Sequence, residues 1–145
     1  MKVLSILTLT IIVLSGCASN YHRKGLIFSD GGHSEIKLGE NVFQVVYEGN
    51  DKTNSEQVSD LNLLRSAEVA LKHGFGYFII LQISGRAVNQ IFDEAPAMSS
   101  TASGFEKTYS ATSTILCSKE KPEISHGQVY DAASVAKSIR KKYGL

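Results

Sequence analysis

Residues 53–74 carry the pattern that most restricts how this chain can fold. Apolar residues recur there at spacings of three and four, which is the period of one face of an α-helix. Thr53 and Glu56 have the spacing of a capping box, and Gly74 suits the left-handed conformation that ends many helices. The pattern therefore predicts a helix over 53–74. Its apolar stripe is Val58, Leu61, Leu64, Ala67 and Leu71, widened by Leu63 and Ala70.

Strand patterns lie on both sides of this helix. Residues 34–38 and 42–48 are separated by the turn residues 39–41, and together they predict a β-hairpin. Residues 77–83 form a continuous apolar run, which predicts a buried strand. Residues 108–117 alternate between the two faces of a half-buried strand. The expected inward positions of that strand are Tyr109, Ala111, Ser113, Ile115 and Cys117.

The C-terminal region predicts a second helix, with Asp131 as its N-cap and an apolar stripe from Ala132 to Tyr143. Between the last two strands the pattern fails over residues 85–106, which indicates a loop with a brief helix over 87–92. The predicted order is β-β-α-β-β-α. It favours an α+β fold with two layers, in which both helices pack on one face of a mainly antiparallel sheet.

The N-terminus has the organisation of an export signal. Lys2 precedes an apolar run over residues 3–14, shorter than the about 18–20 residues that span a bilayer. The run ends in Leu-Ser-Gly-Cys, which resembles the lipobox of bacterial lipoproteins. The resemblance implies a diacylglyceryl thioether on Cys17 and signal-peptidase recognition through Leu14, Ser15 and Gly16. The alternative is that Cys17 is a buried residue of an N-terminal helix.

The lipobox divides the chain into three parts. Residues 1–16 are expected to be a cleaved signal peptide, 17–32 the lipidated N-terminus and tether, and 33–145 a single globular domain. Two or three acyl chains would hold the protein on a membrane, at about 0.8 kcal/mol for each buried CH₂. Ala18 stands where Asp is the usual inner-membrane retention signal, which favours the outer membrane, facing the periplasm.

Charge and length limit the classes of partner. The chain has 15 Lys and Arg against 14 Asp and Glu, and loss of residues 1–16 leaves 14 of each. This balance argues against nucleic acid, and against attraction to headgroups as the main contact with a membrane. The membrane is instead expected as a partner through the covalent lipid on Cys17. The remaining 129 of 145 residues suit one domain with a moderate core.

Lipidation of Cys17 leaves Cys117 as a lone thiol, which excludes an intramolecular disulfide. Because Cys117 falls on the inward face of its strand, we expect it to act as a small buried hydrophobe. The alternatives are a redox-sensing thiol, which requires exposure and a lowered pKa, or a bond between chains.

A family resemblance rests on five short motifs and a later Tyr-Asp-Ala. They resemble a family of small, uncharacterised proteobacterial lipoproteins with Gly-Tyr-Ser-Glu, Gly-Asn, Leu-Arg-Ala-Ala-Glu and Tyr-Phe elements. His33 and Ser66 depart from that pattern, which residues 32–82 match best. The resemblance implies an envelope lipoprotein and brings no catalytic activity. The matching segments are Gly32-His33-Ser34-Glu35, Glu40-Asn41-Val42-Phe43, Gly49-Asn50, Leu63-Leu64-Arg65-Ser66-Ala67-Glu68, Tyr77-Phe78 and Tyr130-Asp131-Ala132.

Catalytic and metal-binding patterns are weak in this sequence. The four histidines His22, His33, His73 and His126 lack the spacing of a metal site, and neither a nucleophile elbow nor a phosphate-binding loop occurs. We therefore predict no catalytic residues, no metal and no cofactor. Arg65 and Glu68, three residues apart on the predicted helix, are expected to form a structural ion pair. The alternative is that Glu68 hydrogen-bonds into the hairpin.

Two classes of function follow from these observations. The first is a lipid-anchored envelope module, non-catalytic, that binds an envelope protein or a cell-wall partner through its sheet face or the 85–106 segment. The second is a periplasmic hydrolase whose catalytic residues are dispersed along the chain. Convergent buried polar groups in a pocket would favour the hydrolase, whereas an apolar patch with a polar rim would favour the binding module.

Overall fold

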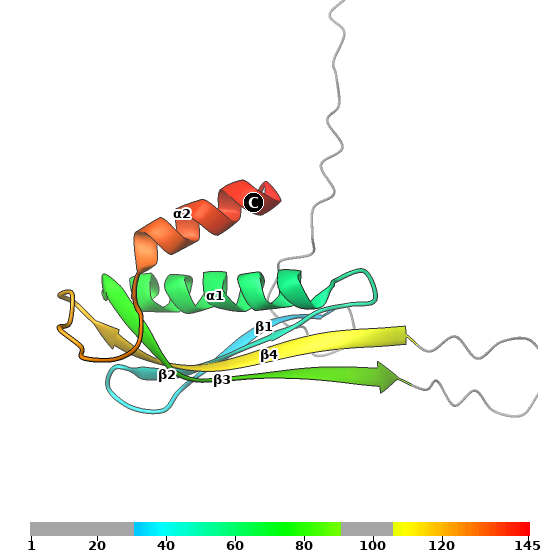
Figure 1. Ribbon diagram of the computed structural model, residues 1–145, viewed down its shortest axis with the longest axis horizontal. Helices are drawn as coiled ribbons and strands as arrows, with labels where there is room; N and C mark the ends of the chain where they lie inside the picture. The colour runs from blue at the N-terminus through cyan, green and yellow to red at the C-terminus, as the bar shows by residue number, and fades with distance from the viewer. Residues whose placement is uncertain (1–30, 91–105) are drawn as a thin grey trace, which may run out of the picture.

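The computed structural model describes residues 31–90 and 106–145, and the strands among them form one five-stranded antiparallel sheet in the order β1-β2-β4-β3-β5. Both described helices lie on the same side of this sheet, α1 against the strands and α2 against α1 (Figure 1). The predicted α+β fold class is therefore confirmed. In chain order the elements are β1 (Gly32–Lys37), β2 (Val42–Glu48), α1 (Ser55–Lys72), β3 (Tyr77–Gln90), β4 (Glu106–Ser118), β5 (Val129–Asp131) and α2 (Ala132–Tyr143).

The connection through α1 joins two strands that are not neighbours. β4 lies between β2 and β3 and is antiparallel to both, so β2, α1 and β3 form a split β-α-β unit. The register aligns Gly32, Glu48, Ser110 and Arg86 across the four strands. The start of β1 therefore lies at the end of the sheet where β3 ends and β4 begins.

The core lies between the sheet and α1. The inward side chains of β2 and β4 alternate with outward ones, as the period of two along a strand requires. Full burial of a large apolar side chain contributes about 1.5–3 kcal/mol, so this layer supplies the main driving force for folding. The buried apolar residues of these elements are Phe43, Val45, Tyr47, Ala111, Ile115 and Cys117 on the strands, and Val58, Leu61, Leu64, Ala67, Val69 and Ala70 on α1.

The start of α1 differs from the predicted capping box. Asn54 is the N-cap, and its Oδ1 accepts a hydrogen bond of 2.8 Å from the backbone N–H of Gln57. The Thr53 hydroxyl is instead used in the preceding turn, where Oγ1 donates to Asn50 Oδ1 at 2.6 Å and accepts from Asn50 N–H at 3.2 Å. At the other end Gly74 has a φ of 79°, as expected for a left-handed residue after a helix.

The third strand is longer and more exposed than predicted. β3 continues to Gln90 and all of its residues except Leu81 pair with β4, so the expected loop from residue 85 and the brief helix over 87–92 are wrong for residues 85–90. A β-bulge interrupts the register between Ile80 and Gln82. Leu81 and Ile83 are 56% and 58% exposed, so this end of the predicted 77–83 strand is not buried as expected.

The last strand was not predicted, because three residues are too few to produce a pattern. β5 pairs with the first three residues of β3 and leads directly into α2. The predicted N-cap of α2 is confirmed, since Asp131 Oδ1 accepts a 2.8 Å hydrogen bond from Ser134 N–H. Within residues 31–90 and 106–145, no helix is long and apolar enough to cross a membrane.

Candidate functional site

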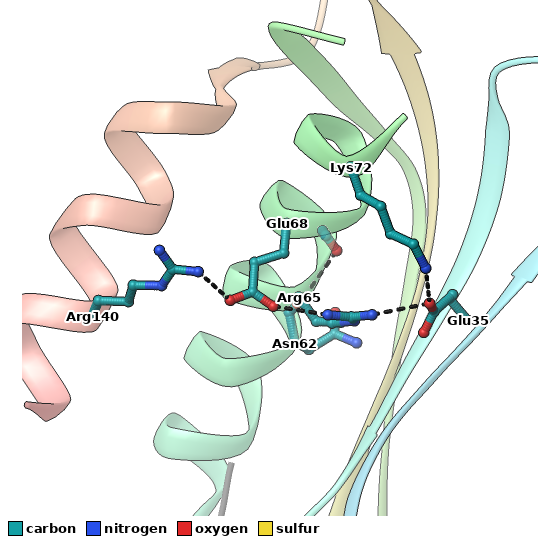
Figure 2. Close-up of polar contacts among 7 residues, drawn as sticks. Glu35, Asn62, Arg65, Glu68, Lys72 and Arg140 are labelled. Carbon is teal, nitrogen blue, oxygen red and sulfur yellow. Dashed lines mark hydrogen bonds and ion pairs between the residues drawn. The ribbon is translucent and has the colours of Figure 1, made fainter. Parts of the chain in front are cut away.

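The most connected polar cluster surrounds Arg65 on α1. Its Nη2 lies 2.9 Å from Glu35 Oε1 of β1, and its Nη1 lies 2.9 Å from Glu68 Oε2 one turn along the helix. Figure 2 shows the guanidinium between the two carboxylates. The three side chains are 14–17% exposed. The guanidinium therefore connects the edge of the sheet to α1 in a partly dehydrated environment.

Two further cations extend this cluster at its ends. Arg140 of α2 places Nη2 2.8 Å from Glu68 Oε1, and Lys72 places Nζ 3.3 Å from Glu35 Oε1. Alternating charges thus join β1, α1 and α2. The Arg65–Glu68 ion pair forms in the structure, and it is Arg65 that makes the ion pair with the hairpin. Sequence spacing alone could not indicate Glu35 or Arg140, because these partners come from distant elements.

The Glu35 carboxyl is held in its ionised form. Burial opposes ionisation, but hydrogen bonds and charge attraction from Arg65, and then from Lys72, outweigh it and lower the pKa of Glu35. A carboxylate with a lowered pKa and two cationic partners is a poor general acid at neutral pH. The arrangement suits a structural connection between elements.

A second polar cluster lies inside the core, where α1 meets β2 and β4. Asn62 Nδ2 donates to the backbone carbonyls of Val45 and Ala111, at 3.1 and 3.0 Å. The Ser113 hydroxyl donates to Asn62 Oδ1, and the Ser66 hydroxyl donates to Asn62 O at 2.9 Å. Asn62, Ser66 and Ser113 are fully or almost fully buried. The cluster therefore fixes the position of α1 on the sheet.

The Asn62 cluster was missed at the level of sequence, although a signal existed. The alternation over 108–117 predicts Ser113 on the inward face of its strand, and Asn62 and Ser66 are four residues apart on one side of the helix. Inward polar residues need hydrogen-bond partners, so the two signals together point to a contact between helix and strand. Only the register of the sheet shows which residues meet.

An open pocket of about 340 Å³ lies at the end of the sheet where β4 ends and β3 begins. Phe75, Ile79, Leu116 and Pro122 provide most of its apolar lining. The lining also includes the polar residues Lys119 and Asn41, and the Asn41 amide Nδ2 donates to Cys117 O at 3.0 Å. The pocket is thus a mainly apolar surface with a few polar groups.

The described histidines are dispersed. His33 is buried in β1, His73 ends α1 with its ring centroid 4.5 Å from that of Phe43, and His126 is exposed after β4. Among residues 31–90 and 106–145, no group of three or more His, Cys, Asp or Glu side chains is placed to hold a metal ion. His22 lies outside the described residues.

Cys117 is buried at the inward face of β4, as predicted. Burial raises the pKa of its thiol from 9.0 to about 11, so the thiol is protonated at neutral pH. The redox-sensing alternative required an exposed thiol with a lowered pKa and is therefore wrong.

The residues predicted for lipid attachment lie outside the described part of the chain. They are Leu14, Ser15, Gly16 and Cys17, together with the signal segment 1–16 and most of the 17–32 tether. Residues 91–105 of the predicted loop also lie outside it. Comparison with protein-family models, with curated proteins and with solved structures found no match to this chain.

Proposed function

We propose that this protein is a lipid-anchored lipoprotein of the cell envelope, held in the outer membrane through Cys17 and facing the periplasm. Its folded domain acts as a non-catalytic binding module for another envelope protein. The anchor rests on the apolar run over residues 3–14 and the Leu-Ser-Gly-Cys that follows it. The family resemblance of residues 32–82 supports the same location.

The single observation that carries the binding role is the open apolar pocket at the β4 end. Its lining of Phe75, Ile79, Leu116 and Pro122 can bury an apolar side chain of a partner, while Asn41 and Lys119 of the same lining can orient polar groups. The polar clusters around Arg65 and Asn62 support this role over hydrolysis. Their side chains bind one another and join elements of the fold.

The position of the pocket also suits a tethered module. The chain enters the sheet at Gly32, which pairs with Glu48, whereas the pocket lies at the opposite end, where Val42 pairs with Leu116. Seven residues of β2 separate these ends by about 20 Å, from a rise of about 3.3 Å for each residue. A tether at Gly32 therefore leaves the pocket free to face away from the anchor.

The anchor is tested by the substitution Cys17→Ser in the full chain. We expect loss of labelling by radioactive palmitate and release of the domain from membranes. Cys117→Ser is the matched control and should keep both label and membrane association. Membrane retention of Cys17→Ser equal to that of the parent chain would contradict the anchor.

The pocket is tested by a photo-crosslinking amino acid placed at Lys119 and, as a control, at Lys52 in the exposed turn before α1. We expect a discrete envelope-protein adduct at position 119. The control position 52 should give no adduct of equal yield. The adduct should weaken when Leu116→Asp introduces a charge into the pocket. Equal capture at both positions would contradict a binding role for the pocket.

A further inference from the structure

α2 forms the outer layer of the described structure and packs on α1. Figure 1 shows it on the side of α1 that faces away from the sheet. Its other main neighbour is β5, the strand that leads directly into it. Its buried side chains are few and mostly small, namely Ala132, Ala136 and Ile139, with Val135 and Tyr143 partly buried beside them. Because hydrophobic stabilisation grows with the apolar area buried, core contacts hold α2 less strongly than they hold α1.

The C-terminal end of α2 is attached to α1 by a group of polar contacts separate from the Arg65 cluster. Lys142 Nζ lies 2.8 Å from Glu56 Oε1 and 2.7 Å from Asp60 Oδ2. The Tyr143 hydroxyl donates to the same Asp60 Oδ2 at 2.7 Å. Lys142 is half exposed and Glu56 is mostly exposed. Ion pairs at such exposure contribute little individually, and they weaken as the salt concentration rises.

The charge of α2 makes it depend on these acids. The helix carries Lys137, Arg140, Lys141 and Lys142, and it contains neither Asp nor Glu. Cations suit the last turn of a helix, but Lys137 and Lys141 are four residues apart, the spacing at which like charges repel. A helix of 12 residues is also only marginally stable by itself in water. Docking on α1 therefore offsets the charge of α2 and supplies the packing that keeps it helical.

α2 covers an apolar side of α1. Asp60 identifies that side, because it forms an ion pair with Lys142 of α2. Leu64 and Ala67 follow Asp60 by four and seven residues, so they share its side of the helix, and both are fully buried. Asn62 lies on the opposite side, where it donates to carbonyls of the sheet. The burial of Leu64 and Ala67 therefore depends on α2.

We propose that α2 is a releasable strap, which undocks from α1 as a unit while α1 and the sheet stay folded. The strap turns where β5 ends at Asp131. Its release uncovers Leu64 and Ala67, an apolar stripe with the carboxylates of Glu56 and Asp60 on the same side of α1. Salt favours release, because it screens the ion pairs that hold the strap. Openings of this kind occur in the least strongly packed elements of a fold. The strap depends neither on the lipid anchor nor on the pocket.

Release of the strap is tested by thiol labelling after Ala67→Cys. The full chain is used with Cys17→Ser, so that the result does not depend on the anchor. Cys117 in the same molecule is the internal control, because it is buried on the inward face of β4 and reports opening of the core. A maleimide labels both thiols, and mass spectrometry of the peptides separates their rates.

We expect the thiol introduced by Ala67→Cys to be labelled at least tenfold faster than Cys117. Relative to Cys117, its rate should rise about threefold between about 0.05 M and about 0.5 M NaCl. Asp60→Asn should raise the rate about threefold at the lower salt concentration. Asp51→Asn, in the exposed turn before α1, is the matched control and should keep the parental rate. Equal labelling of the two thiols, a rate independent of salt, or equal rates for Asp60→Asn and Asp51→Asn would each overturn the strap.

Hydrogen exchange on the parent full chain in detergent is a second measurement, which needs no cysteine substitution. The amides of α2 should exchange at least tenfold faster than those of residues 61–70 in α1. They should do so together along the helix, and faster as salt is added. Equal protection of α2 and residues 61–70 would contradict release. Fast exchange confined to the last turn, which is the fraying of an ordinary helix end, would contradict it as well.

Discussion

Arg65 Nη2 lies 2.9 Å from Glu35 Oε1, although the two residues are 30 positions apart in the chain. The contact joins the middle of α1 to the edge strand β1, and Glu68 on the other side of the guanidinium continues it to Arg140 of α2. Arg65 thus links α1 to β1, and Glu68 links α1 to α2. The consequences for stability can be measured.

Substitution Arg65→Ala should lower the free energy of unfolding by about 3 kcal/mol, because it leaves two partly buried carboxylates without their shared cation. Urea denaturation of the purified protein measures this loss. Lys72→Ala is the matched control, since it removes a cation from the same Glu35 but is 61% exposed. Its cost should be below about 1 kcal/mol. Equal costs for the two variants would contradict a special position for Arg65.

Substitution Ser113→Ala should lower the free energy of unfolding by about 1–3 kcal/mol, because Asn62 Oδ1 loses the hydroxyl that donates to it inside the core. Ser110→Ala on the same strand faces outward and should stay within about 0.5 kcal/mol of the parent. The comparison uses thermal and urea unfolding under identical conditions. A cost for Ser110→Ala as large as that for Ser113→Ala would argue against the buried cluster as a point of attachment for α1.

Stability should fall in acid partly through Glu35. Its pKa is lowered in the folded state from an ordinary 4.5, so its contribution is present above that value and is lost as the pH falls through the folded-state pKa. Between pH 7 and pH 3, the free energy of unfolding should fall less for Glu35→Gln than for the parent. Glu123 is exposed after β4, so the free energy of unfolding of Glu123→Gln should depend on pH as that of the parent does. If the free energy of unfolding of Glu35→Gln fell with pH as steeply as that of the parent, Glu35 would not be a source of the acid sensitivity.

The Cys117 thiol should react slowly in the folded protein. A pKa raised from 9.0 to about 11 lowers the thiolate fraction about a hundredfold at neutral pH, and burial blocks access as well. In a Cys17→Ser background, a chromogenic disulfide reagent should label Cys117 only in urea. Leu38→Cys in the same background is 55% exposed and should react at once. Labelling of native Cys117 at the Leu38→Cys rate would contradict its burial.

Local patterns in the sequence were enough for the fold class and most elements. The spacing of Leu61, Leu64 and Ala67 predicts α1, and the alternation over 108–117 predicts β4 with Cys117 facing inward. These patterns are local because helix and strand periods are properties of adjacent residues. The Arg65–Glu68 spacing is local for the same reason, and the two side chains are paired.

The strand over 85–90 could not be predicted, because its residues have no strand pattern of their own and depend on β4 for pairing. The same limit applies to Thr53. Its spacing from Glu56 fits a capping box, but its hydroxyl hydrogen-bonds to Asn50 and the N-cap is Asn54. The backbone conformation of the turn decides which partner the Thr53 hydroxyl bonds.

The sequence by itself determined the periods of the elements and their order, and it predicts the lipid anchor at Cys17. Only the tertiary structure decided that Glu35 meets Arg65, that Asn62 meets Ser113, and that β5 pairs with β3 as far as Ile79. The physical reason is that strand register and helix placement bring together residues whose separation in the chain carries no signal. Periodicity specifies which face of an element is buried, and packing specifies what that face touches.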